Sequence, residues 1–556
     1  MKKRTLSLVL ALVMLLTLVP ASLSLAEEEI VTLQVFSMQS NASGLQDNSY
    51  WAEILRRDLG IQIELMPAGD QAGDKLNSYM ANNQLPDIVV FKDDYKLITN
   101  AIEAGLLVNL DEHQDKLPNV YANALNGIEY FRDNVSNKTG AAYAVPNSIT
   151  TQSSTSGITN SGPYLRWDLY KQLGYPVINE LEDYLPVLQQ MLALEPTNPD
   201  GQKNYGISIW SDWDGKFCYP ARVVEEFYGV SPEGFGFQER NFVENTFTSI
   251  FDDASYYKRA LKFYFSANQM GILDPDSLTH GWGDFWDKTS AGRVMFSFWS
   301  WGFGTYATAE KDAQGIGFKP VYFTAEKQYN EDGPKYIGSK NAFAIGKDTK
   351  NLDKALAFID YMYSYDGLWN LALGDKGVFW DLDESGAPYR TELGWKMKDE
   401  VLEFENGGLV GDGLNTINAY GMPWFVKHPV YGYRMDEIDW QKADFAPADS
   451  TLVVEWREKM GANDDLDYLT QHDLLVQPPF APMPPVTDEV EQIMSRVGDM
   501  VKTESWKMIF AKDEAEFESL FDAMGEKAQG MGVETADNWV IENYNAALES
   551  GAKYMK

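Results

Sequence analysis

Strand-like and helix-like hydrophobic patterns alternate through the first hundred residues of the chain, and this alternation restricts the fold more than any other feature. Residues 30–36 (IVTLQVF) read as a strand, residues 50–59 carry apolar side chains at helical spacing, and residues 61–65 (IQIEL) read as a second strand. A helix-like segment over 75–83 precedes 85–91 (LPDIVVF), whose near-continuous apolar run is typical of a strand buried on both faces. The pattern predicts two successive βαβ units and a mostly parallel sheet covered by helices.

The loops after the predicted strands should share one edge of this sheet. In open α/β sheets, ligands bind beyond the carboxyl ends of the strands. We therefore expect the loops at residues 37–41, 66–70 and 91–94 to face a binding site, with Asp70 as a candidate for hydrogen bonding to ligand hydroxyls.

The chain is too long for a single hydrophobic core. Its 556 residues predict two or more lobes. A Ser/Thr/Gly-rich stretch up to Gly162 reads as a crossing into a second α/β lobe, in which residues 254–270 form a helix with Asp253 as its N-cap. Residues 341–345 read as a strand that returns to the first lobe, and helices follow the proline-rich segment 477–485.

Charge and motif content exclude several classes of function. With 82 acidic and 46 basic residues the formal charge is −36, which repels nucleic acid and anionic lipid headgroups. Cys218 is the single cysteine, so neither an intramolecular disulfide nor an all-cysteine metal site can form. The four histidines lack metal-ligand spacing, and no phosphate-binding glycine loop or nucleophile elbow is present. We expect no cofactor and no nucleic-acid partner.

The N-terminus has the pattern of a secretory signal over residues 1–26. Basic residues 2–4 precede an apolar run over 6–19, and small residues follow Pro20 up to Ala26. No cysteine lies near this position, so attachment through an N-terminal lipidated cysteine is not expected. We expect export to an extracellular, cell-envelope or periplasmic location; an uncleaved anchor is the alternative.

One stretch matches the spacing of a calcium loop only weakly. Asp381, Asp383, Ser385 and Glu392 occupy ligand positions of a twelve-residue loop. However, Pro388 stands where an apolar strand residue is wanted, and Asp-Glu-Ser-Gly is ordinary hairpin-turn chemistry, so we favour a turn.

Tryptophans cluster at the ends of predicted strands and beside acidic residues. Three short segments carry them: 210–213 (WSDW), 281–286 (GWGDFW) and 298–302 (FWSWG). Flat indoles that stack on sugar rings, next to carboxylates that accept hydroxyl hydrogen bonds, are the parts of a carbohydrate site. Core packing is the alternative for each tryptophan. For the group, we expect two or three to line a cleft.

Taken together, ordered motifs along nearly the whole chain resemble one family. The chain is similar to extracellular solute-binding proteins of carbohydrate ABC transporters, in particular the large oligosaccharide-binding branch of Gram-positive lipoprotein type. The matching segments are 82–89 (NNQLPDIV), 104–110 (AGLLVNL), 142–146 (AYAVP), 165–169 (LRWDL), 173–176 (LGYP), 354–361 (KALAFIDY), 374–380 (GDKGVFW), 506–510 (WKMIF) and 542–547 (ENYNAA).

This resemblance implies a two-lobe periplasmic-binding-protein-like fold of type II, with hinge strands and a C-terminal helical extension. The first lobe would span residues 27–145 plus about 340–385, and the second 146–339 plus about 386–556. The implied activity is non-catalytic capture of an oligosaccharide or related glycan fragment and its delivery to an ABC-transporter permease, by a monomer. An exported glycan-cleaving enzyme, or a binder of a peptide or other solute in the same fold, are the alternatives.

The resemblance also implies two candidate ligand contacts. In sugar-binding relatives, an aromatic and an acidic residue shortly after the Pro-Asp-Ile strand contact the ligand. Phe91 and Asp94 correspond to them. The stacking candidates are Trp210, Trp213, Trp282, Trp299, Trp301 and Trp380, and the polar candidates are Asp70, Asp94, Asp212 and Arg166. A structural ion pair with Asp168 or another acid would equally explain Arg166. Some relatives hold calcium in a loop that corresponds to residues 196–205, and the acids lost there argue against that ion.

Overall fold

A six-stranded sheet forms the centre of the first lobe. The computed structural model describes residues 30–40, 42–92, 95–153, 161–231, 235–329, 333–339, 341–398, 402, 416–417, 419–435 and 449–555. The strand order is β2-β3-β1-β4-β13-β5, with β1 parallel to both β3 and β4. The two predicted βαβ units are confirmed. Successive side chains of β4 (Ile88–Phe91) enter separate hydrophobic cores on the two faces of the sheet, which explains the continuous apolar sequence of that strand.

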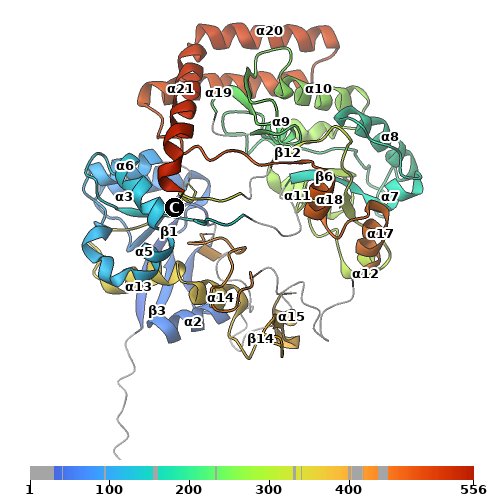
Figure 1. The fold of residues 1–556 in the computed structure, drawn as a ribbon. Coiled ribbons are helices and arrows are strands. Elements are labelled where there is room, and N and C mark those ends of the chain that lie inside the picture. Colours follow the sequence, from blue (N-terminus) through green and yellow to red (C-terminus); the bar gives the residue numbers. More distant parts are fainter. Residues whose placement is uncertain are drawn as a thin grey trace, which may run out of the picture.

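The first lobe collects elements from two distant parts of the chain (Figure 1). They are β1 (Val31–Ser37), β2 (Gly44–Gln46), α2 (Tyr50–Leu59), β3 (Ile61–Leu65), η1 (Gly69–Gln71), α3 (Ala72–Ala81), β4 (Ile88–Phe91), α4 (Tyr95–Glu103), η2 (Leu110–Lys116), α5 (Pro118–Asn123), α6 (Leu125–Asn134), β5 (Ala144–Pro146), β13 (Ala342–Ile345), α13 (Leu352–Met362), α14 (Tyr365–Leu373), β14 (Trp380–Leu382), β15 (Pro388–Arg390) and α15 (Glu392–Lys398).

The second lobe surrounds a three-stranded antiparallel sheet of order β10-β6-β11. Its elements are β6 (Ser161–Arg166), α7 (Trp167–Gln172), η3 (Leu181–Asp183), α8 (Tyr184–Leu194), α9 (Tyr219–Glu225), β7 (Val230–Ser231), β8 (Gln238–Asn241), β9 (Thr246–Ser249), α10 (Tyr256–Gln269), η4 (Pro275–Leu278), α11 (Trp282–Ser290), β10 (Phe296–Trp299), α12 (Ala309–Ala313), β11 (Phe318–Pro320), β12 (Gln328–Tyr329), α17 (Thr451–Met460), α18 (Asp465–Gln471), β16 (Leu475–Val476), α19 (Asp488–Ile509), α20 (Glu514–Gly530) and α21 (Val533–Ser550). The short helix η6 (Gly551–Tyr554) follows α21 and contacts the first lobe.

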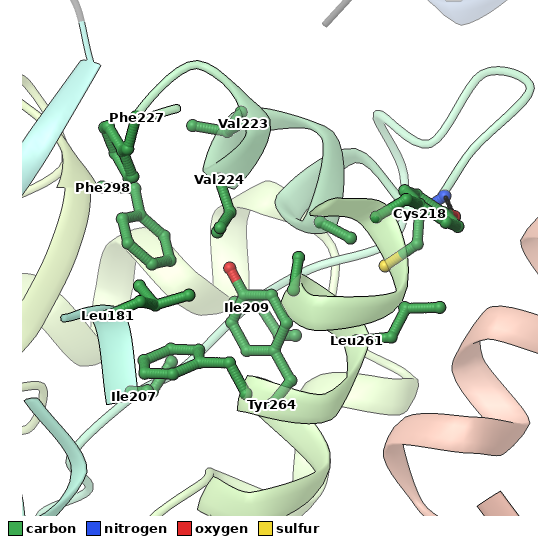
Figure 2. Packing of buried hydrophobic residues seen from close by; sticks show 14 of the residues in the cluster. Leu181, Ile207, Ile209, Cys218, Val223, Val224, Phe227, Leu261, Tyr264 and Phe298 are labelled. Carbon is green, nitrogen blue, oxygen red and sulfur yellow. Dashed lines mark hydrogen bonds between the residues drawn. The ribbon is translucent and has the colours of Figure 1, made fainter. Parts of the chain in front are cut away.

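Helices α9 and α10 pack against each other at the centre of the second-lobe core. Figure 2 shows Val224 and Cys218 of the α9 region gathered with Leu261 and Tyr264 of α10. The Tyr264 hydroxyl donates a hydrogen bond to the carbonyl of Pro220 at 3.0 Å, which satisfies the polar end of a buried side chain. Cys218 is buried and unpaired, so the chain builds this core without a disulfide.

The predicted N-cap of α10 is wrong by two residues. Ser255, and not Asp253, accepts the backbone N–H of Lys258 through its side chain. Asp253 instead pairs with the ammonium group of Lys258 at 2.6 Å. The serine is buried and the aspartate exposed, so the shorter side chain takes the cap that lies inside the protein.

Two paired chain segments join the lobes, as the expected hinge strands do. Thr150 donates its backbone N–H to the carbonyl of Lys335 at 3.1 Å, and Ser339 donates to Asn147 at 2.7 Å. Gly338, with φ +72°, lies so close to the other linker that an added Cβ would be 2.5 Å from the carbonyl oxygen of Asn147. The close approach of the two backbones therefore requires glycine here.

The predicted lobe boundaries need two corrections. Ile417, Met422 and Val426 pack into the core of the first lobe, so the described residues between 386 and 435 belong to that lobe and not to the second. At the end of the chain, α21 leads back to the first lobe (Figure 1), where Tyr554 is buried against α6. A helix or strand pattern does not show which lobe a segment packs against, because that depends on partners distant in sequence.

The predicted signal segment, residues 1–26, lies outside the described residues. Among the helices that the structure does describe, none combines the length and apolarity needed to cross a bilayer.

We expect the contact between Tyr554, near the end of the chain, and helix α6 to contribute measurably to stability. The Tyr554 ring packs edge-on against Tyr130 at 5.4 Å, and its hydroxyl donates to Asp133 at 2.9 Å. Tyr554→Ala should lower the free energy of unfolding by about 2–3 kcal/mol, because it removes a buried ring. Tyr554→Phe keeps the ring and should cost about 1 kcal/mol. Urea unfolding followed by circular dichroism measures both, and an unchanged midpoint for Tyr554→Ala would show that the terminus is not anchored.

Candidate ligand-binding surface

The strand registers place the ends of both sheets at the junction between the lobes. In the first lobe, Ala342 at the start of β13 pairs with Phe91 at the end of β4 and with Pro146 at the end of β5. In the second lobe, Trp299 at the end of β10 pairs with Ser161, where the chain begins β6 after the first linker. The carboxyl ends of the parallel strands and the end of β10 therefore lie beside the points where the linkers attach.

Five tryptophans from three separate segments meet beside the end of β10. Their indoles lie at centroid distances of 4.6 Å (Trp210–Trp299), 5.0 Å (Trp210–Trp282 and Trp213–Trp282), 5.4 Å (Trp282–Trp301) and 5.7 Å (Trp299–Trp301). We call this group, with the neighbouring Tyr219, the aromatic surface. The sequence analysis singled out each of these tryptophans, and the structure brings them together.

The aromatic surface has a buried base and an accessible layer. Trp210 and Trp299 are 0% and 2% exposed, so they pack in the core. Trp213 is 41% exposed, while Trp282 and Trp301 are half-buried against the same core. Trp213 and Trp282 stack with an interplanar angle of 24°. The base fixes the rings above it, which are the ones that a ligand could reach.

Two aspartates are oriented next to these rings by backbone N–H groups. Asp212 accepts a hydrogen bond from the N–H of Trp282 at 2.9 Å, and Asp284 accepts one from Gly281 at 3.1 Å. Both carboxylates are exposed. A Cβ on Gly281 would lie only 3.1 Å from Asp212, so glycine at this position leaves room for the carboxylate at the start of α11.

A partly buried ion-pair cluster holds α11 in place. Lys288 of α11 contacts Asp274 at 2.7 Å, Asp276 at 2.8 Å and His280 Nε2 at 3.0 Å. The two acids and the histidine form the one group in the described chain with metal-ligand proximity, but the lysine ammonium already lies between them. Burial, with the Lys288 charge, lowers the pKa of His280. The cluster therefore positions the helix that carries Trp282.

Asp214 lies directly behind the aromatic surface. It is buried and accepts hydrogen bonds from the indole N–H of Trp506 at 2.5 Å and from the N–H of Tyr219 at 3.0 Å. Burial raises the pKa of its carboxyl to about 6, although both hydrogen bonds act in the opposite direction. Asp214 also borders a hollow of about 740 Å³ between Leu278, Lys502 and Trp506.

The remaining candidates lie elsewhere. Phe91 is fully buried in the sheet core, and Trp380 is 2% exposed and donates its indole N–H to Gly374 at 3.0 Å, so neither offers a face to a ligand. Arg166 is buried and forms ion pairs with Asp168 at 2.8 Å and with Glu195 at 3.2 Å. These ion pairs favour a structural role for Arg166 over a role in ligand binding. Asp94, and the side chain of Asp70, lie outside the described part of the chain.

Two aromatic residues near the junction were not singled out from the sequence. Tyr219 stacks on Trp299 with an interplanar angle of 13°. Trp424 is 42% exposed, in a segment whose Lys427 N–H donates to Gln152 of the first linker at 3.0 Å. Neither lies in a segment that contains two tryptophans, whereas each of the three tryptophan segments singled out from the sequence contains two.

Neither stretch considered for calcium has the geometry of an ion site. Asp383 accepts hydrogen bonds from the N–H groups of Ser385 and Ala387 in the turn between β14 and β15, which confirms the predicted hairpin. In the loop over residues 196–205, the Asn198 side chain accepts the N–H of Gln202 at 2.9 Å and donates to Ala291 at 3.1 Å. The only carboxylate in that loop is the exposed Asp200, so its donors do not fit calcium.

The raised pKa of Asp214 predicts a specific pH dependence. A carboxyl that is protonated more readily in the folded state stabilises the protein at low pH, and this contribution is lost as the pH rises through about 6. Between about pH 4 and pH 7 the wild type should lose about 2–3 kcal/mol relative to Asp214→Asn. Urea unfolding of both proteins across this range measures the difference, and a constant difference would contradict the assignment.

Comparison with known proteins identifies the fold. No family model matches the chain. Among curated proteins, the chain is similar to lipoprotein LipO of Bacillus subtilis (strain 168), with 21% identity over 460 residues that cover 79% of this chain and 85% of the relative.

Solved structures with the same fold cover nearly the whole chain. A solute-binding protein from Bifidobacterium longum infantis, described as HMO-binding and associated with an ABC transporter, matches with TM-score 0.55 and 17% identity over 93% of this chain and 98% of its own. The alginate-binding protein AlgQ2 gives 0.59 and 14% over 93% and 98%. FusA of S. pneumoniae, an ABC-transporter binding protein solved with kestose, gives 0.58 and 14% over 93% and 99%. The chain therefore has the two-lobe α/β fold of ABC-transporter solute-binding proteins.

Proposed function

We propose that this protein binds an oligosaccharide outside the cell membrane, without cleaving it, and delivers it to an ABC-transporter permease. The observation that carries the proposal is the aromatic surface at the junction between the lobes. Accessible indoles above a rigid buried base, flanked by oriented carboxylates, offer stacking faces and hydroxyl acceptors together. Structures with this fold include proteins described as binding HMO, alginate and kestose.

The hinge provides the mechanism of capture. Two hydrogen-bonded linkers connect lobes that each contain a hydrophobic core of their own, so small backbone rotations can change the separation of the lobes. Ligand contacts that form only in the closed arrangement would shift the population toward it. The closed form then presents both lobes to the permease as one surface.

We expect sugar binding to stabilise the protein and to leave the sugar intact. A thermal-shift screen of residues 27–556 against oligosaccharides and peptides, followed by chromatography of each mixture, tests this. A ligand at about one hundred times its Kd should add about 2.7 kcal/mol to the free energy of unfolding. Shortened sugars would identify an enzyme instead, and a response to peptides alone would contradict the carbohydrate assignment.

The accessible tryptophans should carry much of the affinity. Trp213→Ala and Trp282→Ala should each weaken binding of the sugar found in that screen by about 1–3 kcal/mol, or about 5- to 150-fold, because each removes a stacking face. Isothermal titration measures the change. Trp539→Ala, which removes a partly buried tryptophan from α21, is the matched control and should leave the affinity unchanged. Unchanged affinity in both test variants would exclude the aromatic surface as the binding site.

A further inference from the structure

The polar groups next to the aromatic surface are the negatively charged carboxylates of Asp212 and Asp284, which accept hydrogen bonds. Asp212 precedes Trp213 in the chain, and Asp284 lies in the first turn of the helix that begins with Trp282. One oxygen of each carboxylate is occupied by a backbone N–H. Within the described residues, the second oxygen of each has no hydrogen-bond partner and is exposed to solvent. Each aspartate therefore combines a fixed orientation with a free acceptor.

The three lysines on or near these segments are already in ion pairs. Lys288 of α11 is held by Asp274 and Asp276. Lys216, three residues after Trp213, forms an ion pair with Glu491 at 3.0 Å. The third lysine, Lys502, lies beside the 740 Å³ hollow and contacts Asp499 at 3.5 Å. None of these lysines is thus available as an uncompensated cation for an acidic ligand.

This distribution of charge favours binding of neutral glycans over acidic ones. The hydroxyls of a neutral sugar can donate to the free carboxylate oxygens while the rings stack on the indoles, and hydrogen bonds to a charged acceptor are about twice as strong as neutral ones. A uronate or sulfate group at the same place would face like charge without a compensating cation, which disfavours binding. The net charge of −36 acts in the same direction during approach, because it repels anions over a longer range.

We propose, on the basis of the proposed function, that the aromatic surface selects uncharged oligosaccharides and that Asp212 and Asp284 determine this selectivity. The protein would then differ in ligand class from the alginate-binding structure that shares its fold. Asp212 accepts hydrogen bonds from ligand hydroxyls and repels acidic groups, and Asp284, whose Oδ2 would lie 4.0 Å from a Cβ on Gly281, provides the second acceptor.

The test compares neutral and acidic sugars of matched length on the full mature chain. Isothermal titration at low ionic strength would use gluco-, manno- and fructo-oligosaccharides against oligomannuronates and oligogalacturonates. We expect at least one neutral series to bind, and acidic sugars to bind at least about tenfold more weakly. Asp212→Asn and Asp284→Asn should weaken neutral binding by about tenfold and reduce the discrimination against acidic sugars. Asp522→Asn, which removes the same charge from an exposed position on α20, should change neither.

The outcomes distinguish this inference from the function on which it rests. Acidic sugars that bind as tightly as neutral ones, or more tightly, would overturn the selectivity while leaving glycan capture intact. Discrimination that persists in both asparagine variants would overturn the role of the two aspartates. No binding by either sugar class to a folded protein would overturn the proposed function itself. Melting temperatures of all variants identify any loss of folding.

Discussion

The pairing of the two linkers is the constraint on which the arrangement of the molecule depends. Because β13 must enter the first-lobe sheet between β4 and β5, the chain leaves that sheet and returns to it on adjacent strands. The linkers therefore run side by side and hydrogen-bond to each other, and Gly338 permits their close contact. The same geometry places the ends of β4 and β10 at the junction, which is why loops from both lobes are available to one ligand.

The aromatic surface shows how a hydrophobic core can support a binding site. Trp210 and Trp299 are core residues whose burial stabilises the second lobe, and they also form the base against which Trp282 and Trp301 pack. The ion pairs of Lys288 also hold α11, so the position of Trp282 is fixed both by ring packing and by these ion pairs. A ligand that stacks on rings held in this way loses little free energy to ordering of the side chains.

The C-terminal extension ties the lobes together a second time. Helices α19, α20 and α21 pack on one another, and α19 packs on α10 of the second lobe, while Tyr554 and Lys553 contact α6 of the first. The proline-rich segment contributes as well, because the carbonyl of Met483 accepts a hydrogen bond from Tyr130 at 2.6 Å. Movement of the lobes must therefore occur with the extension attached to both.

The sequence alone determined the parts of this protein that depend on local patterning. Alternating strand and helix patterns over residues 30–91, with a near-continuous apolar run at the last strand, predicted the parallel sheet. Tryptophans grouped near aspartates indicated where a sugar could stack. Tertiary structure decided which of those rings is accessible: Trp213 is exposed, whereas Trp210, Trp299 and Trp380 are buried by residues distant in sequence. It also paired Arg166 with Glu195 in addition to Asp168, and it placed the described residues between 386 and 435 in the first lobe. Periodicity reports only that one face is apolar, and exposure depends on which other segments pack against that face.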